Sequence, residues 1–305
     1  MANYLVTGGA GFIGSNLAEQ LSRNNVVVII DNLLTGSVKN IPPGAIWMKG
    51  VTLKQFCTEE HRATDTREPF KFDGIFHLGQ PSSTPMYRAD RHLIGKAISD
   101  FIYLAEYAFK NNIKMVYASS SSVYNGNETP WREDMNLLPT DFYTEVRIAY
   151  ERIASVYHQM HQLKAIGLRL FSVYGPHEES KKQYANLITQ MLWAKQRGEV
   201  FDIYGNGEQR RDATYVNDIV RAFILAMKSP IECEVFNVGT GVSYSLNEIA
   251  ERIGTKIRYV PVPFSNYVDA TMADTTKAEK FLGFKARISL NDGLQQLNDY
   301  YHTSD

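Results

Sequence analysis

Three glycines near the N-terminus stand where they could hold a phosphate group. Gly8, Gly11 and Gly14 form a G-x-x-G-x-x-G pattern directly after a short strand-like segment at residues 3–7. Glycine permits a tight turn and a close backbone approach to a pyrophosphate, and the free N–H groups of a following helix favour that charge. Asp31 ends the next strand-like run, at a spacing suited to a ribose 2′-hydroxyl. A structural turn is the alternative for the glycines, but this context predicts a dinucleotide site.

The same aspartate indicates which dinucleotide binds. A carboxylate at Asp31 would repel the 2′-phosphate of NADP, and no Arg or Lys follows it before Lys39. The sequence therefore favours NAD as the cofactor.

Helices and strands that would position these residues alternate along the first half of the chain. Ile13, Leu17 and Leu21 fall at helical spacing after the glycines, and residues 26–30 are a continuous β-branched run. Such a run is typical of a strand buried on both faces of a parallel sheet. Further strands are expected at 73–78, 114–118 and 165–171, with helices at 92–110 and 142–162. Strands separated by helices predict βαβ units and an α/β fold, a Rossmann-type doubly wound parallel sheet.

The pattern changes after residue 172. Helices are expected at 184–197 and 215–228, a turn-rich loop at 204–208, and an amphipathic segment near 290–301. No Gly/Ser linker or charge run separates the two halves. We predict that residues 1–172 form the NAD-binding domain, with 213–238 packing back on it, and that 173–305 form mainly a smaller, mixed α/β substrate domain.

Composition excludes several classes of protein. The formal net charge of the 305 residues is −1, which argues against binding nucleic acid or anionic membranes by bulk electrostatics. No apolar stretch approaches the ~20 residues of a membrane-spanning helix, and residues 1–20 lack the basic start of a signal peptide. The expected location is the cytoplasm. Cys57 and Cys233 are far apart and predict packed thiols, not a disulfide framework.

The order of the motifs resembles one enzyme family. The runs TGGAGFIGSNL at 7–17 and DNLLTG at 31–36 are similar to the NAD-dependent sugar epimerase/dehydratase family of extended short-chain dehydrogenases/reductases. The likeness continues at 75–78, 119–124, 169–176, 204–216 and 273–284, so it covers nearly the whole chain. It implies that the cofactor contacts include Gly8, Gly11, Phe12, Ile13, Gly14, Asp31, Asn32, Leu78, Tyr143 and Arg147.

The resemblance also implies the catalytic residues. In this family a tyrosinate takes the proton of a sugar hydroxyl during a transient oxidation, and Tyr143 occupies that position. Ser120 is implied as the hydroxyl that shares the proton, with Ser121 and Ser122 as close competitors. The family places a lysine one helical turn after the tyrosine, where both side chains face the cofactor. An interfacial aromatic without a chemical role is the alternative for Tyr143.

The residue one turn after Tyr143 is Arg147 instead of lysine. A free tyrosine has a pKa of about 10, and bringing it near neutrality needs about 4 kcal/mol of differential stabilisation. Arginine supplies a permanent charge and can donate to a ribose, but its long planar fork does not mimic an ammonium point donor. The resemblance therefore implies that Arg147 supplies the positive charge beside Tyr143 and binds the ribose. The alternative is that the chain binds NAD without turnover.

On the substrate side the resemblance holds with departures. Residues 207–218 match an arginine–aspartate element, so Arg211, or else Arg210, is implied to pair with a substrate diphosphate. Solvated surface arginines are the alternative. The substrate contacts implied in total are Ser121, Ser122, Ser172, Arg210 and Arg211.

Three positions differ from the family pattern around the sugar. Ser172 stands in place of the usual Asn, Gly79-Gln80 replace an alanine pair, and residues 263–266 hold no Arg where the family has one. In addition, no acidic residue follows Ser120, which disfavours a 4,6-dehydratase. The sugar and its nucleotide base stay open, with uridine and thymidine diphosphate sugars both possible.

These implications lead to one expected function and two alternatives. The expected reaction is C4 epimerisation of a nucleotide-diphosphate sugar through a 4-keto intermediate. A keto-sugar reductase or dehydrogenase, and an NAD-binding protein without catalysis, are the alternatives. Helices 92–110 and 142–162 match those that pair in family dimers, so a homodimer is expected. His158, His161 and Glu151 do not show metal-ligand spacing, and no metal is expected.

Overall fold

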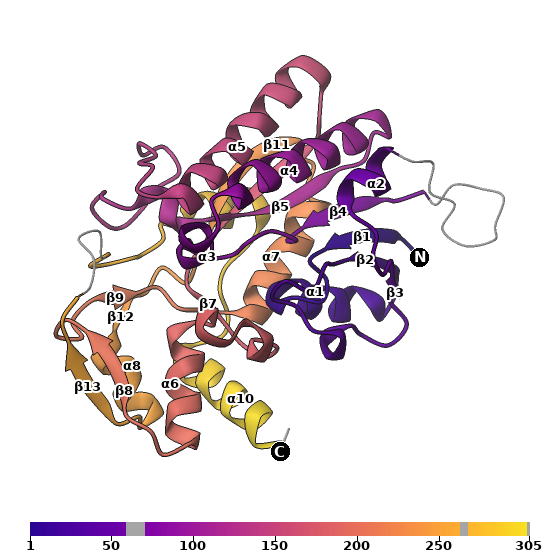
Figure 1. The fold of residues 1–305 in the computed structure, drawn as a ribbon. Helices are drawn as coiled ribbons and strands as arrows, with labels where there is room; N and C mark the ends of the chain where they lie inside the picture. The colour runs from indigo at the N-terminus through magenta and orange to yellow at the C-terminus, as the bar shows by residue number, and fades with distance from the viewer. Residues whose placement is uncertain (59–70, 263–267, 304–305) are drawn as a thin grey trace.

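A computed structural model describes residues 1–58, 71–262 and 268–303 of the chain. Seven parallel strands form its central sheet in the order β11–β6–β5–β4–β1–β2–β3 (Figure 1). Their bounds are β1 (Asn3–Thr7), β2 (Val26–Ile30), β3 (Ile46–Trp47), β4 (Gly74–His77), β5 (Met115–Ser120), β6 (Ala165–Leu170) and β11 (Cys233–Val238). The Rossmann-type α/β fold predicted from the alternation is confirmed.

Helices cover both faces of this sheet. Alternate residues of one strand face opposite layers, so Leu5 packs with Phe101 on one face while Val6 packs with Leu17 and Phe223 on the other. The first layer holds α2 (Leu53–Thr58), α4 (His92–Lys110) and α5 (Phe142–His161), and the second holds α1 (Phe12–Ser22) and α7 (Val216–Lys228). A short helix, α3 (Thr84–Ala89), lies against α4 and α5.

A smaller mixed region lies below the carboxyl ends of the strands in Figure 1. It contains three two-stranded pairs: β7 (Val173–Tyr174) with β10 (Thr214–Tyr215), β9 (Arg210–Arg211) with β12 (Tyr244–Ser245), and β8 (Phe201–Tyr204) with β13 (Ile257–Val260). Its helices are α6 (Leu187–Gln196), α8 (Leu246–Ile253) and α10 (Leu290–Thr303), whereas α9 (Thr276–Leu282) packs against β11 and α7. Two of its three strand pairs are parallel, and β9–β12 is antiparallel.

Two expected element boundaries were wrong. Residues 184–197 do not form one helix, because Glu179–Tyr184 form a 3-10 helix, η3, and α6 begins only at Leu187. Asn186 caps α6, where its side-chain oxygen accepts a hydrogen bond from the N–H of Ile188 at 2.9 Å. The strand expected to end at residue 118 continues to Ser120, where β5 still pairs with β6.

Residues 213–238 return to the central sheet. The helix α7 covers one sheet face, and β11 pairs in parallel with β6 from Cys233 to Val238. The exact division into two domains at residue 172 stays a prediction. None of the helices in the described ranges combines the length and the apolar character that crossing a membrane requires.

Candidate active site

The glycine turn lies where the strand order of the sheet reverses. From β1 the chain continues to β2 on one side, and it later returns to β4 on the other side. In open α/β sheets, ligands bind in the crevice outside the strand ends at this switch point. The turn after β1 meets the turn after β4 there, and a Cβ atom on Gly8 would lie 2.6 Å from the backbone nitrogen of Gly79.

The glycines are required by space as well as by backbone conformation. Gly8 has a φ of 72°, and a Cβ atom on Gly14 would lie 2.1 Å from the carbonyl oxygen of Gly8. This close approach brings the start of α1 against the turn, so its first N–H groups face the crevice. The arrangement fits a pyrophosphate, which needs backbone donors and no intervening side chains.

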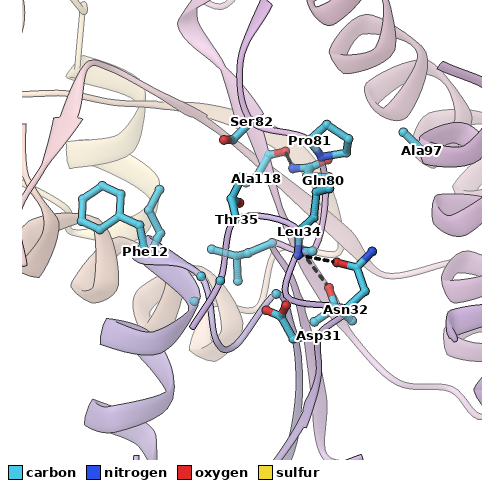
Figure 2. Close-up of a pocket in the computed structure, with 18 of the residues that line it drawn as sticks. Phe12, Asp31, Asn32, Leu34, Thr35, Gln80, Pro81, Ser82, Ala97 and Ala118 are labelled. Atoms are coloured by element: carbon cyan, nitrogen blue, oxygen red, sulfur yellow. Dashed lines mark hydrogen bonds between the residues drawn. The ribbon is translucent and has the colours of Figure 1, made fainter. Parts of the chain in front are cut away.

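A cavity of about 750 Å³ extends from this turn across the strand ends. Thirteen predicted site residues line it: Gly8, Gly11, Phe12, Ile13, Gly14, Asp31, Asn32, Leu78, Ser120, Ser121, Tyr143, Arg147 and Ser172. Three predicted substrate residues, Ser122, Arg210 and Arg211, do not line it. The cavity thus brings the dinucleotide motif and the tyrosine-containing helix together. Figure 2 shows part of its wall, including Phe12, Asp31 and Gln80.

Asp31 is held by backbone donors at one end of the cavity. Its Oδ2 accepts from the N–H of Ala10 at 2.9 Å, and its Oδ1 accepts from the N–H of Leu33 at 2.7 Å. Burial raises the pKa of the Asp31 carboxyl, while these N–H groups favour its charged form. The carboxylate is therefore fixed in direction before a ribose arrives.

Tyr143 and Arg147 stand at the other end, on the first turns of α5. Asp141 caps this helix, accepting from the N–H of Thr144 at 2.9 Å. The guanidinium carbon of Arg147 lies 4.6 Å from the centre of the Tyr143 ring, a cation–π contact. Arg147 is 2% exposed and donates to the side-chain oxygen of Gln80 and, at 2.7 Å, to the carbonyl of Pro81.

The serine run after β5 divides into different environments. Ser120 lines the cavity, and its hydroxyl oxygen accepts from the N–H of Ser122 at 3.2 Å and from its hydroxyl at 3.0 Å. Ser122 therefore supports Ser120 from behind. Ser119 donates to Glu151 at 2.5 Å and so ties the end of β5 to α5.

Sequence reasoning missed a buried ion pair behind the serines. Arg169 makes two bonds with Glu151, Nε to Oε1 at 2.9 Å and Nη2 to Oε2 at 2.6 Å. It also donates to the hydroxyl of Tyr124, which in turn donates to Asn237 at 2.8 Å. The network links β5, β6, α5 and β11 behind the end of the cavity that Tyr143 and Arg147 line. Its only signal in the sequence was polar residues inside otherwise buried segments.

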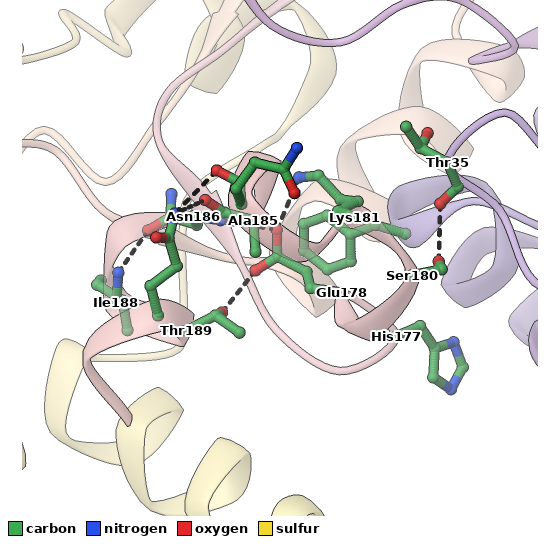
Figure 3. Close-up of polar contacts among 12 residues, drawn as sticks. Thr35, His177, Glu178, Ser180, Lys181, Ala185, Asn186, Ile188 and Thr189 are labelled. Atoms are coloured by element: carbon green, nitrogen blue, oxygen red, sulfur yellow. Dashed lines mark hydrogen bonds and ion pairs between the residues drawn. The ribbon is translucent and has the colours of Figure 1, made fainter. Parts of the chain in front are cut away.

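Residues 178–186 form a further wall that the sequence analysis did not single out (Figure 3). The buried carboxylate of Glu178 accepts from Lys181 at 2.7 Å, from the N–H of Asn186 at 3.0 Å and from Thr189 at 2.5 Å. Ser180 donates to the carbonyl of Thr35 at 2.7 Å. These bonds place Lys181, Tyr184 and Asn186 in the cavity wall.

The two arginines implied for a diphosphate lie on β9. Arg210 donates to the carbonyl of Ser243 at 2.6 Å and lies 3.4 Å from the carboxylate of Glu248. Arg211 donates to the carbonyl of Arg210 at 2.8 Å. Both arginines are thus engaged by neighbouring groups, and neither lines the cavity. Residues 263–266, where the family arginine is missing, lie outside the described residues.

The fold and this cavity define a dinucleotide-binding α/β protein, and comparison with known proteins specifies its family. A model of the NAD dependent epimerase/dehydratase family matches residues 4–239, so the chain belongs to that family. NAD is the cofactor, and the glycine turn and the fixed Asp31 carboxylate fit its pyrophosphate and ribose.

Individual relatives differ in their reactions. A putative UDP-glucose 4-epimerase of Methanocaldococcus jannaschii is 30% identical, with 96% of each chain covered. A UDP-N-acetyl-alpha-D-glucosaminuronate decarboxylase of Bacillus cytotoxicus is 28% identical, with 97% of each chain covered. The crystal structure of Thermotoga maritima UDP-glucose 4-epimerase with UDP-glucose superposes with a TM-score of 0.90, at 28% identity and 99% coverage of both chains. The comparisons therefore support a nucleotide-sugar enzyme without fixing its reaction.

Proposed function

We propose that this protein interconverts two nucleotide-diphosphate sugars that differ in configuration at C4. NAD, when bound, supplies the oxidant that accepts a hydride from the sugar and later returns it. Rotation of the resulting 4-keto sugar within the cavity would expose its other face and so invert C4. The structural similarity to a UDP-glucose 4-epimerase along the whole chain supports this reaction.

Tyr143 is the proposed acid and base. Tyr143 lines the same cavity as the glycine turn, which supports a role for its phenol beside a dinucleotide. Ser120 lines that cavity too and is the proposed hydrogen-bond partner of the sugar hydroxyl. Ser120 already accepts two bonds from Ser122, so its own proton is available to donate toward the cavity. Ser121 and Ser172 are proposed sugar contacts from the same wall, and Arg211 a contact of the diphosphate.

Arg147 supplies positive charge next to the phenol. Its guanidinium cannot be deprotonated under ordinary conditions, so it favours a negative charge on Tyr143 whenever the proton leaves. The contact between Arg147 and the Tyr143 ring at 4.6 Å is the observation on which the proposal chiefly rests. It supports a role for arginine as the cation beside the Tyr143 ring where the family has lysine.

Incubation with sugar nucleotides tests this function. UDP-galactose, UDP-N-acetylgalactosamine and their thymidine counterparts are supplied separately, and the products are separated by chromatography. We expect interconversion of at least one pair, with no net change in nicotinamide absorbance. Tyr143→Phe should lower turnover by about 10²- to 10⁴-fold, the usual contribution of a general acid–base. Full turnover in that variant would remove Tyr143 from the mechanism.

One observation favours a second candidate, an NAD-binding protein without turnover. Arg147 is bonded to Gln80 and Pro81, which restrains it from reaching across the cavity to a ribose. This candidate predicts tight NAD binding, no conversion of any sugar nucleotide, and a gain of activity in Arg147→Lys. The incubation above distinguishes the two.

We also propose that the protein is a homodimer. The pair of helices α4 and α5 lies on the outside of one sheet face, and it exposes the apolar side chains of Ile102, Val156 and Met160. Exposed apolar residues on adjoining helices suit a contact between two copies. Light scattering of the purified protein should give twice the chain mass of 34.6 kDa.

A further inference from the structure

Gln80 connects three elements at the catalytic end of the cavity. Its side-chain nitrogen donates to the carbonyl of Ala118, near the end of β5, at 2.8 Å. Its side-chain oxygen accepts from the guanidinium of Arg147, and the next residue, Pro81, accepts from the same guanidinium at 2.7 Å. Gln80, Pro81 and Ala118 lie close together in Figure 2. The loop after β4 therefore holds a side chain of α5 while it is itself held by β5.

These bonds restrict a side chain that is otherwise flexible. An unrestrained arginine side chain has many rotamers, so its positive charge has no single position. Here two of its nitrogens are bonded, and the Nε atom is buried without a partner among the described residues. The guanidinium carbon lies 4.6 Å from the centre of the Tyr143 ring and 5.5 Å from that of Tyr150. The charge is fixed against the tyrosines.

We propose that Gln80 is a positioning residue, which holds the Arg147 guanidinium against Tyr143 without cancelling its charge. This proposal rests on the function proposed above, because it explains how arginine serves where the family has lysine. An amide oxygen accepts a hydrogen bond from a guanidinium but carries no net charge, so the field at Tyr143 is preserved. A carboxylate at this position would form an ion pair with Arg147 and neutralise that field.

Other titratable groups also surround the Arg147 guanidinium. Tyr150 faces it from α5, Tyr87 from α3 and His77 from β4, and Asp100 of α4 faces Tyr150. Burial raises the pKa of Tyr87 and of Tyr150 above the ordinary value of 10.0. Burial lowers the pKa of His77 to about 3. Neither of these tyrosines ionises at a lower pH than a free one.

The experiment follows the absorbance of the Tyr143 phenolate as the pH is raised, using the full-length protein loaded with NAD. The phenolate signal near 295 nm is measured for each protein and for the same protein carrying Tyr143→Phe, and the difference isolates Tyr143. Gln80→Glu should move the midpoint of that difference upward by at least about one pH unit, the size of shift that one adjacent charge produces. Gln80→Ala, which releases the guanidinium, should move it upward by less.

Gln296→Glu is the matched control, because it introduces the same charge on the exposed face of α10 and should leave the midpoint unchanged. Midpoints for Gln80→Glu and Gln80→Ala equal to that of the unaltered protein would overturn the proposal. If only one of these variants folds, its shift or lack of shift decides in the same way. The titration contains no sugar nucleotide, so its result does not depend on turnover. A shifted midpoint here, combined with no conversion in the separate sugar-nucleotide incubation, would retain the positioning role of Gln80 and reject the epimerase function.

Discussion

The two ends of the cavity are built in different ways. At the dinucleotide end, backbone groups define the site: the turn around Gly8, Gly11 and Gly14, and the N–H groups that hold the Asp31 carboxylate. At the catalytic end, the surface is made of side chains, with Tyr143 and Arg147 from α5 meeting groups from the loop after β4 and the end of β5.

This difference explains where the chain keeps the family pattern and where it departs from it. A site made of backbone needs only that no side chain intrude, so the spacing of the glycines defines it completely. A site made of side chains can change when two partners change together. Arg147 and Gln80 are such a pair, because each departs from the family pattern and the two are bonded to each other. Substitutions at the catalytic end should therefore act by breaking buried side-chain interactions. Substitutions at the dinucleotide end should act by filling the space that the glycine turn needs.

The largest effect is expected for Glu151→Ala at the catalytic end. The change leaves Arg169 buried with its charge unpaired, and breaking a buried pair in this way typically costs about 3–5 kcal/mol. The two side chains are 7% and 3% exposed, so solvent offers little compensation. We expect the free energy of unfolding, measured by urea denaturation, to fall by that amount.

A second two-bond ion pair provides the matched control. Arg258 bonds Asp202 through Nε and Nη2, both at 2.8 Å, but these side chains are 66% and 42% exposed. Asp202→Ala should cost less than about 1 kcal/mol, as exposed pairs usually do. Equal losses in the two variants would show that burial of the Glu151 pair does not matter.

Features that are specified locally along the chain could be predicted from the sequence. The run at 26–30 and the helix at 92–110 have the predicted bounds, because hydrophobic pattern and length specify them locally. Gly8, Asp31 and Tyr143, which the sequence indicated, all line the cavity, and their roles stay predictions. The helix expected from residue 184 was wrong, because Asn186 forms the cap and its side chain decides the start.

Two of the contacts missed by sequence reasoning join residues that are distant in the chain. Gln80 and Arg147 are 67 positions apart, and Ser180 is 145 positions from Thr35. Glu178 is bonded within its own segment, and Ser180 is one of the groups that hold that segment to the first part of the chain, through the loop after β2. No periodicity or motif in a single sequence indicates such pairings, whereas the fold brings them within bonding distance.

At the dinucleotide end, Gly14→Ala should weaken NAD binding. The added Cβ atom would lie 2.1 Å from the carbonyl oxygen of Gly8, so the turn must move. Overpacking of this kind typically costs about 1–3 kcal/mol, or about 5- to 150-fold in the dissociation constant. Calorimetric titration with NAD measures it. Gly95→Ala is the control, because nothing lies within 4 Å of a Cβ atom there. Unchanged affinity in Gly14→Ala would show that the turn tolerates a side chain.

The smallest effect concerns pH, and it distinguishes the ends through their histidines. Burial and the nearby Arg147 lower the pKa of His77 to about 3 in the folded protein, against about 6.5 in an unfolded chain. Between these values the unfolded chain binds a proton that the folded one does not, so the folded state loses stability as the pH falls. The loss attributable to this residue is about 1.4 kcal/mol for each pH unit below about 6.5. Denaturation at pH 6.5 and at pH 5.5, for the unaltered protein and for His77→Gln, gives the difference in the slope of the unfolding free energy against pH.

His177 provides the comparison at the dinucleotide end. It bonds Ser15 beside the glycine turn and is only partly buried, and burial lowers its pKa too. His177→Gln should therefore remove a smaller part of the slope than His77→Gln does. The opposite order would mean that the dinucleotide end, and not the catalytic end, carries the buried neutral histidine on which acid stability depends.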